Sequence, residues 1–194
     1  MARQHKAHNP KHTGKEKYNF FLSVIFPASQ LYVMDYNRVV QDLNGLTETE
    51  FLAKIGEKFT VEETGQNRPP QRHTFGMYLG GKWYTLTAKK GTFNPDDPVA
   101  VLDVSILQNN LLRPVLGIGD PRTDKRISFV GGIRGLKALE ERVNQNNGKV
   151  AFSMFPTSMS ELMKVADAHQ IMPPKSTWFE PKLRSGLVIY TYDD

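Results

Sequence analysis

The sequence predicts an α+β fold, with a mixed, largely antiparallel sheet of about eight strands on which about four helices pack. Three observations predict it. Short runs of aromatic and β-branched residues dominate the first half, and strand-like and helix-like segments alternate in the second half. Thr47-Glu48-Thr49-Glu50 and Ser158-Met159-Ser160-Glu161 are capping boxes, which mark helix starts. With 194 residues, 39% of them hydrophobic, the chain has enough apolar residues for a core of ordinary size.

Most of the predicted strands lie in the first half of the chain and are separated by turns. The clearest pair is a hairpin in which Gly80-Gly81 supplies the positive φ angles that a tight turn needs. The strands of the second half alternate with helices. The predicted strands cover residues 19–27, 31–36, 59–63, 73–79, 82–88, 126–130, 150–155 and 186–192.

Four helices are predicted from the spacing of apolar residues. The second of them runs from Val99 to about Leu116, is apolar on several sides and should be well buried, with Pro114 ending or kinking it. Asp103 lies inside this segment, and a buried carboxylate needs a partner. Gly148 should stop the third helix. The residues expected to face inward in the other three helices are Phe51, Leu52 and Ile55; Ile133, Leu136, Leu139 and Val143; and Met159, Leu162, Met163 and Ala166.

The sequence shows no internal repeat and no linker after residue 17. We therefore expect residues 18–194 to form a single α+β domain, preceded by a basic polar segment at residues 1–17. That segment holds most of the net charge of +5, so the rest of the chain is close to neutral. A near-neutral domain without a basic stripe argues against nucleic acid as a partner.

Composition excludes several classes of site. There is no cysteine, which excludes disulfides, thiolate catalysis and cysteine-type zinc sites. The N-terminus lacks the apolar core of a secretory signal, and no stretch approaches the roughly 18 apolar residues of a membrane span. We expect a cytoplasmic protein without a membrane partner. His5, His8 and His12 have helical spacing, but Pro10 interrupts it and we expect no metal site.

Two short segments are candidate anion-binding sites. Gly131, Gly132 and Arg134 lie where a strand meets a helix, and free N–H groups at a helix start bind anions. A tight turn explains the same glycines equally well. Arg38 follows a predicted strand together with Asp35 and Asn37; the alternative is an Asp/Asn turn with an exposed arginine.

The strongest candidate is the loop between Ile171 and Arg184. Three prolines make it rigid, and it is rich in groups that donate hydrogen bonds to phosphate or another oxyanion. We predict Lys175 and Glu180 as catalytic residues, Glu180 acting as a general base or a metal ligand. The alternative is a long connection held to the core by Trp178 and Phe179. The predicted anion-binding residues of the loop are Ser176, Thr177, Lys182 and Arg184.

Five segments together resemble one bacterial and archaeal family, catalogued as domain of unknown function 1015. They are HTGKEKYNFFLSVIFPASQLYVMDYNRVVQDLNGL, LDVSILQNNLLRPVLGI, ISFVGG, PTSMSELMKVAD and IMPPKSTWFEPKLRSGL. The resemblance covers nearly the whole chain and is to the C-terminal portion of the family.

The resemblance implies that something is missing. Full members are about twice as long, and their N-terminal half resembles the ParB/sulfiredoxin-like fold and ends in an Asp-Gly-His-His-Arg motif. This motif does not occur here. The chain therefore resembles a truncated member, an isolated C-terminal domain or a fragmentary gene product, and residues 1–17 look like the remnant of a preceding domain.

Relatives of that N-terminal half include free-serine kinases, which use ADP or ATP. The resemblance thus implies the C-terminal domain of a small-molecule, serine-type phosphotransferase that is inactive alone. It would bind a small or phosphate-bearing ligand without a cofactor of its own, and a full-length protein would use ATP or ADP with Mg²⁺. The alternative is a non-catalytic binding or regulatory module of ParB-like ancestry, associated with nucleic acid.

Overall fold

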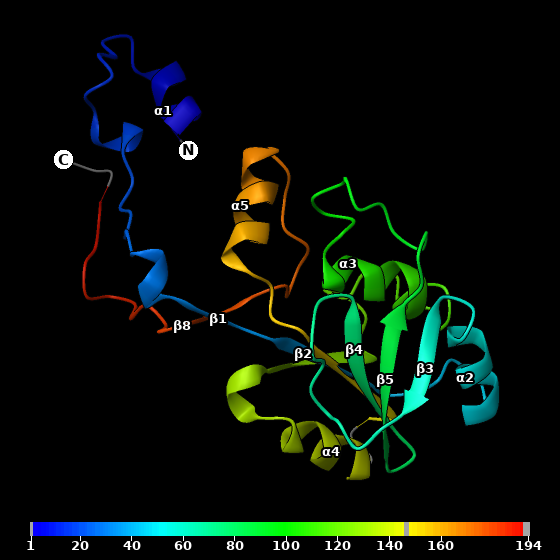
Figure 1. The fold of residues 1–194 in the computed structure, drawn as a ribbon. Helices are drawn as coiled ribbons and strands as arrows, with labels where there is room; N and C mark the ends of the chain where they lie inside the picture. Colours follow the sequence, from blue (N-terminus) through cyan, green and yellow to red (C-terminus); the bar gives the residue numbers. More distant parts are fainter. Residues whose placement is uncertain (1, 146–147, 192–194) are drawn as a thin grey trace. The chain divides into compact units, whose positions relative to one another are not determined.

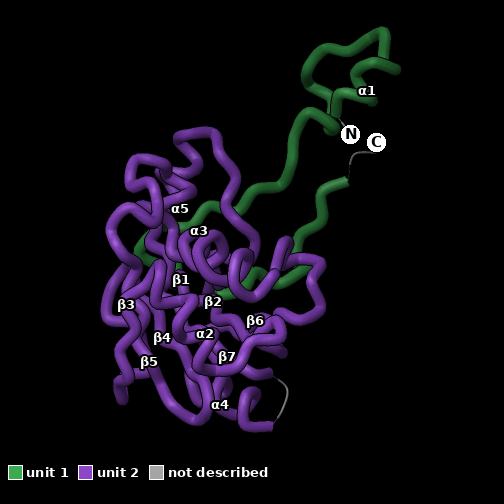
Figure 2. The backbone as a smooth tube through the Cα atoms, turned by 90° about the vertical axis from the view of Figure 1, so that its right-hand side faces the viewer, with its two compact units in different colours: residues 1–31, 181–194 green, residues 32–180 purple. Residues whose placement is uncertain are grey.

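The computed structural model describes residues 2–145 and 148–191. The chain divides into two compact units (Figure 2). Unit 1 comprises residues 1–31 and 181–194, and unit 2 comprises residues 32–180. The expectation of one domain from residue 18 onward stays a prediction. Among the described helices, none has the length and apolar character needed to cross a membrane.

Unit 2 is built on a six-stranded sheet with the strand order β3-β5-β4-β7-β2-β6 (Figure 1). A second sheet pairs only β1 with β8. All of these pairs are antiparallel, so the expected strands fall into two sheets, and the expected mixed sheet is antiparallel throughout the described residues. The strands are β1 Tyr32–Met34, β2 Tyr36–Val40, β3 Phe59–Glu63, β4 Thr74–Leu79, β5 Lys82–Ala88, β6 Ile127–Gly131, β7 Val150–Met154 and β8 Trp178–Glu180.

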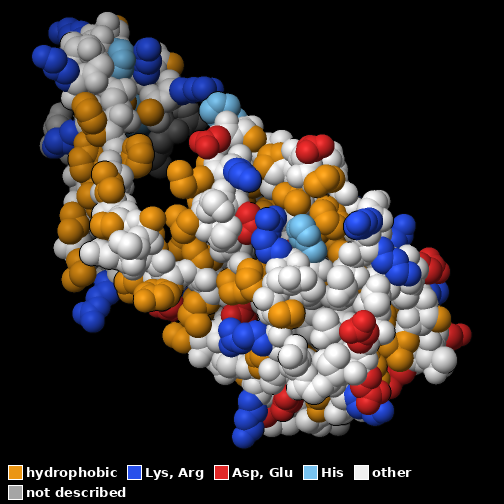
Figure 3. Space-filling view, in the orientation of Figure 1, with side chains coloured by type: hydrophobic (Ala, Val, Ile, Leu, Met, Phe, Trp, Pro, Cys, Tyr) orange, Lys and Arg blue, Asp and Glu red, His pale blue; other side chains and the backbone are white. Residues whose placement is uncertain are grey.

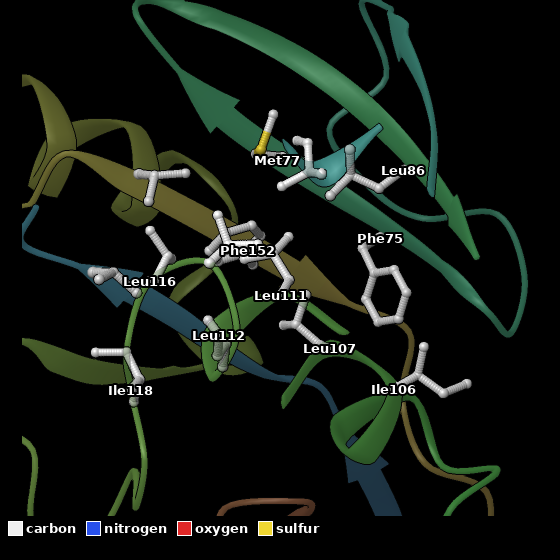
Figure 4. Close-up of a cluster of buried hydrophobic side chains, with 14 of the residues drawn as sticks. Phe75, Met77, Leu86, Ile106, Leu107, Leu111, Leu112, Leu116, Ile118 and Phe152 are labelled. Atoms are coloured by element: carbon white, nitrogen blue, oxygen red, sulfur yellow. The ribbon is translucent and has the colours of Figure 1, made fainter. Parts of the chain in front are cut away.

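Helices cover both faces of the six-stranded sheet, and each face has its own core. On one face, apolar side chains of α2 and α3 pack against Phe75, Met77 and Phe152 (Figure 4). On the other face, α4 packs Leu139 against Val39 and Tyr78. The helices are α1 Ala2–His8, α2 Glu48–Ile55, α3 Asp103–Leu107, α4 Lys137–Asn144 and α5 Met159–Asp167, with short helical turns η1 Lys17–Asn19, η2 Ala28–Gln30, η3 Gln108–Leu112 and η4 Gly132–Arg134.

The local signals of the sequence are confirmed. Both capping boxes form, with the Thr47 and Ser158 side chains accepting from the backbone of Glu50 and Glu161. The hairpin β4–β5 turns at Gly80-Gly81, where both φ angles are positive. Phe51 and Ile55 of α2 are buried as expected.

Two predicted strands are wrong. Residues 19–27 and 186–191 form no strand, and residue 192 lies outside the described residues. Their large apolar side chains are exposed, with Ile25 at 90% and Ile189 at 76%, and hydrophobic side chains gather along these segments of unit 1 (Figure 3). Strand-type composition is not enough, because a strand also needs a neighbour to pair its N–H and C=O groups.

Three predicted helices differ in extent or facing. The helix expected from Val99 starts at Asp103 and continues from Gln108 as a π-helix. The third helix starts only at Lys137 and ends at Asn144, so Ile133 lies before it and is exposed, and Gly148 does not stop it. In α5 the buried residues are Glu161 and Val165, neither of which was among the residues expected to face inward. The buried Glu161 carboxylate is paired with the Arg72 guanidinium.

Candidate anion-binding site

A cavity of about 610 Å³ lies in unit 2, between the sheet, α3 with its π-helical extension, and the proline-rich loop. Arg38 comes from β2, Ser105 and Gln108 come from the helix, and Pro173 and Pro174 come from the loop. Arg113 also lines the cavity, from the turn after the π-helix. Asp120 and Arg122 line it as well and form an ion pair at 2.8 Å, which leaves a net positive lining beside apolar walls. Such a lining suits a small organic anion.

Strand alternation places Arg38 on the core face of the sheet. Side chains two residues apart point the same way, so Arg38 faces the same side as the fully buried Val40. Its neighbours on the adjoining strands are Phe129 and Phe152. Arg38 is only 4% exposed, which makes it a charged side chain inside an apolar layer.

The Arg38 guanidinium is held by backbone groups rather than by an acid. Nη1 donates to the Tyr36 carbonyl, Nη2 donates to the Lys175 carbonyl at 3.2 Å, and Cζ lies 5.7 Å from the centre of the Phe129 ring. Among the described residues, no carboxylate lies within ion-pair distance of it. A guanidinium has more N–H donors than these carbonyls take up.

Burial lowers the pKa of Arg38 to about 10, and the Coulombic influence of Asp103 and then of Tyr36 partly offsets it. The side chain is still charged at neutral pH. A buried cation without an acid costs free energy that a bound anion recovers. The site therefore has the chemistry of an oxyanion receptor, since guanidinium groups match carboxylate and phosphate geometry.

The polar residues beside Arg38 have structural partners. The Asn37 side chain donates to Asp35 Oδ2 at 2.5 Å and accepts from the Met154 amide at 2.9 Å. Both side chains are buried. The alternative of an Asp/Asn turn with an exposed arginine is therefore wrong for this segment. The sequence did not show that β2 is an inner strand of the sheet, between β7 and β6.

The predicted site residues of the loop follow the part of it that lines the cavity, which ends at Pro174. Lys175 is exposed, has a φ of +56°, and places Nζ 5.4 Å from the Tyr36 ring centre. Ser176 is buried, and its polar groups have partners: its hydroxyl donates to the Pro173 carbonyl, and its own carbonyl accepts from Thr157 Oγ1 at 3.1 Å. Thr177 is half-buried. The Arg38–Lys175 hydrogen bond, like the contact of Lys175 with Tyr36, connects this loop to β2.

Glu180 does not line the cavity. Glu180 Oε1 accepts from Trp178 Nε1 at 2.7 Å, across one edge of β8. Lys182 and Arg184 belong to unit 1, whereas Glu180 belongs to unit 2.

Gly131 and Gly132 are needed for close packing. A Cβ on Gly131 would lie 2.5 Å from the Trp178 ring, and one on Gly132 would lie 2.3 Å from Asp35 Oδ1. The turn that follows is the three-residue η4, whose Arg134 side chain is exposed. Trp178 thus rests on the bare backbone at the end of β6.

Inspection of the sequence missed the residues that the second predicted helix brings to the cavity, Ser105, Gln108 and Arg113. Gln108 opens the π-helix, and such irregular turns are frequent at functional sites. Pro114, six residues after Gln108, was the signal in the sequence that this helix is irregular. Among the described residues, no group of three acidic or histidine side chains is placed to hold a metal ion.

The model of the family described as Protein of unknown function (DUF1015) matches residues 1–105, more than half of the chain. The chain belongs to this family. The resemblance expected from the sequence is thereby confirmed for these residues, while the assignment to the C-terminal portion of DUF1015 stays a prediction. No curated protein matches this DUF1015 chain.

Solved structures similar to this DUF1015 chain include a free serine kinase in complex with AMP, at 12% identity and a TM-score of 0.46. They also include a conserved hypothetical protein from Pyrococcus furiosus, at 12% identity and a TM-score of 0.47. Each match covers 77% of this chain, and 54% and 56% of those chains respectively. The DUF1015 chain thus spans about half the length of these structures, and likeness at this level carries no argument about its chemistry.

Proposed function

We propose that this DUF1015 chain binds a small anionic molecule in the cavity through Arg38. We further propose that it is the C-terminal domain of a small-molecule phosphotransferase and is inactive by itself. The observation that supports anion binding is the buried Arg38 guanidinium, which lines the cavity without a carboxylate partner among the described residues. A phosphate or carboxylate group would supply that partner.

The other groups of the cavity suit the same ligand. The Arg113 side chain is exposed at the cavity and adds a second positive charge. The Ser105 hydroxyl lines the cavity and has no hydrogen-bond partner among the described residues, so it is available to donate to the ligand. Pro173 and Pro174 provide apolar contact for its uncharged part.

The phosphotransferase part of the proposal rests on the family resemblance alone. Phosphoryl transfer depends on positioning and on neutralising charge, which is what a buried arginine provides. A full-length protein would then use ATP or ADP with Mg²⁺, a further domain would complete the site, and Lys175 and Glu180 would act in catalysis.

The direct test is binding of inorganic phosphate, O-phosphoserine and ADP at constant pH and ionic strength, measured by NMR titration or calorimetry. We expect at least one of them to bind, and Arg38→Met to weaken it by about tenfold or more, since a charge-assisted contact is lost. Met fills a similar volume, so the fold should persist. Arg68→Met is the matched control and should bind like wild type, because Arg68 is exposed and does not line the cavity.

Equal affinity of the Arg38→Met and wild-type proteins would refute the assignment of the site. Activity is tested separately, as serine-dependent nucleotide turnover in a full-length relative with and without the change equivalent to Lys175→Ala. Unchanged turnover would refute a catalytic role for Lys175. Tight binding of DNA that weakens steeply with salt would instead support the non-catalytic, nucleic-acid-associated alternative.

A further inference from the structure

The first residue of α3 is a buried acid close to the anion cavity. Asp103 is 8% exposed, and its Oδ1 accepts from the His73 backbone N–H at 2.9 Å. The two residues that follow it, Val104 and Ser105, both line the cavity that contains Arg38. Among the described residues, no cation lies within ion-pair distance of Asp103.

The charged groups around Asp103 come from three other elements. Arg72 precedes β4 and is committed to Glu161 of α5, with 2.8 Å between Nη2 and Oε1. The nearby His73 ring has a pKa below its usual value, chiefly because of burial, and is therefore neutral at pH 7. Arg38 of β2 completes the set, and its charge and that of Asp103 act on each other.

Asp103 is therefore poised to change its charge under mild conditions. Burial raises the pKa of this carboxyl to about 7, against the lowering effect of the His73 hydrogen bond, and the Glu161 charge raises it further. The charges of Arg72 and Arg38 lower it only in part. Asp120 lines the cavity and is paired with Arg122, whose hydrogen bond lowers the pKa of Asp120 to about 2, so its charge is constant between pH 6 and 8. Asp103 is therefore the nearby carboxylate whose opposition to a bound anion changes with pH.

We propose that the cavity binds its anion together with a proton, which is taken up by Asp103. This inference rests on the proposed anion-binding function and adds its regulation. When Asp103 is neutral, it neither offsets the Arg38 charge nor repels the ligand, so affinity is higher. By linkage, a bound anion in turn favours the protonated form of Asp103.

The test uses sulfate, because phosphate changes its own charge between pH 6 and 8 whereas sulfate does not. Sulfate is titrated into the full chain at pH 6 and pH 8, and the amide shifts of cavity residues such as Ser105 are followed by NMR. Sodium chloride keeps the ionic strength constant. We expect the wild type to bind sulfate roughly threefold to tenfold more tightly at pH 6.

Asp103→Asn is the decisive variant, since an amide oxygen can still accept from the His73 N–H but carries no charge. It should bind sulfate equally at both pH values, with an affinity close to that of the wild type at pH 6. Histidine titration elsewhere in the chain is unchanged in this variant, so it serves as its own control. A wild-type ratio near one, or a pH ratio retained in Asp103→Asn, would overturn the inference.

A second measurement needs no variant. The pKa of the Asp103 carboxyl, followed by ¹³C NMR in the wild type, should rise when sulfate is present, and an unchanged value would also overturn the inference. Absence of sulfate binding at both pH values would reject anion binding itself, and the inference with it. Binding that depends on Arg38 but not on pH would leave the proposed function standing and reject only the proton linkage.

Discussion

At the scale of residues, the site depends on two charges that the fold buries. Arg38 is charged despite burial because its pKa of about 10 is still well above neutral pH, and the Tyr36 and Lys175 carbonyls accept hydrogen bonds from it. Among the described residues, the one hydrogen bond to the Asp103 carboxylate comes from the His73 amide, so its charged form is poorly stabilised. Sequence inspection identified both residues, Arg38 as an anion ligand and Asp103 as a buried acid needing a partner. Its partner turned out to be a backbone N–H, which no residue pattern specifies.

The stability of the protein should depend on the Asp103 charge. Its folded pKa of about 7 lies above the ordinary value of 3.8, so the stabilising contribution is complete below the unfolded value and is lost as the pH rises through 7. Between pH 6 and 8 this group alone should remove about 1.4 kcal/mol from the free energy of unfolding. Asp103→Asn should lose that part of the pH dependence.

Urea unfolding at pH 6 and pH 8 gives the change in the free energy of unfolding with pH for each protein. The change in Asp103→Asn is subtracted from that in the wild type, so that the contributions of other titrating groups cancel. A pH dependence of the same size in wild type and variant would show that Asp103 is not the responsible group.

At the scale of elements, short-range signals were reliable where the chain satisfies its own polar groups. The capping box at Thr47 closes within four residues, and the hairpin at Gly80-Gly81 needs only its two flanking strands. The short sheet of β1 and β8 was not foreseen, because Val33 finds its partner Phe179 near the opposite end of the chain. The strand expected at residues 19–27 has strand composition but no partner among the described residues.

The capping box gives a prediction for α2. Thr47→Ala removes the hydroxyl that accepts from the Glu50 amide and donates to the Glu50 carboxylate, and should cost about 1 kcal/mol of stability. Thr49→Ala, two residues further along and exposed, is the matched control and should be neutral or slightly stabilising. Chemical denaturation of both variants decides it, and equal destabilisation would show that capping is not the cause.

At the scale of the whole molecule, unit 2 contains the six-stranded sheet, both cores and the cavity, whereas the described residues of unit 1 contain no buried large apolar side chain. A unit with its own core should fold alone. Residues 32–180 expressed alone should therefore unfold cooperatively, at a midpoint temperature within about 5 °C of the full chain.

A fragment of residues 18–180 is the informative comparison, because the sequence placed a domain start at residue 18. If only the longer fragment gives a dispersed NMR spectrum and cooperative unfolding, residues 18–31 belong to the folding unit and the division at Leu31 does not describe folding.

The sequence by itself determined the α+β class, the hairpin, both capping boxes and the family, because each depends on residues that are neighbours along the chain. Only the tertiary structure decided that Arg38 and Asp103 are buried. Their charges matter because strands and helices from distant parts of the chain exclude water from them, and burial is a property of the folded whole. For the same reason, the sequence showed that the proline-rich loop is rigid and polar but did not show what it contacts in the fold. There the Lys175 backbone carbonyl accepts a hydrogen bond from Arg38.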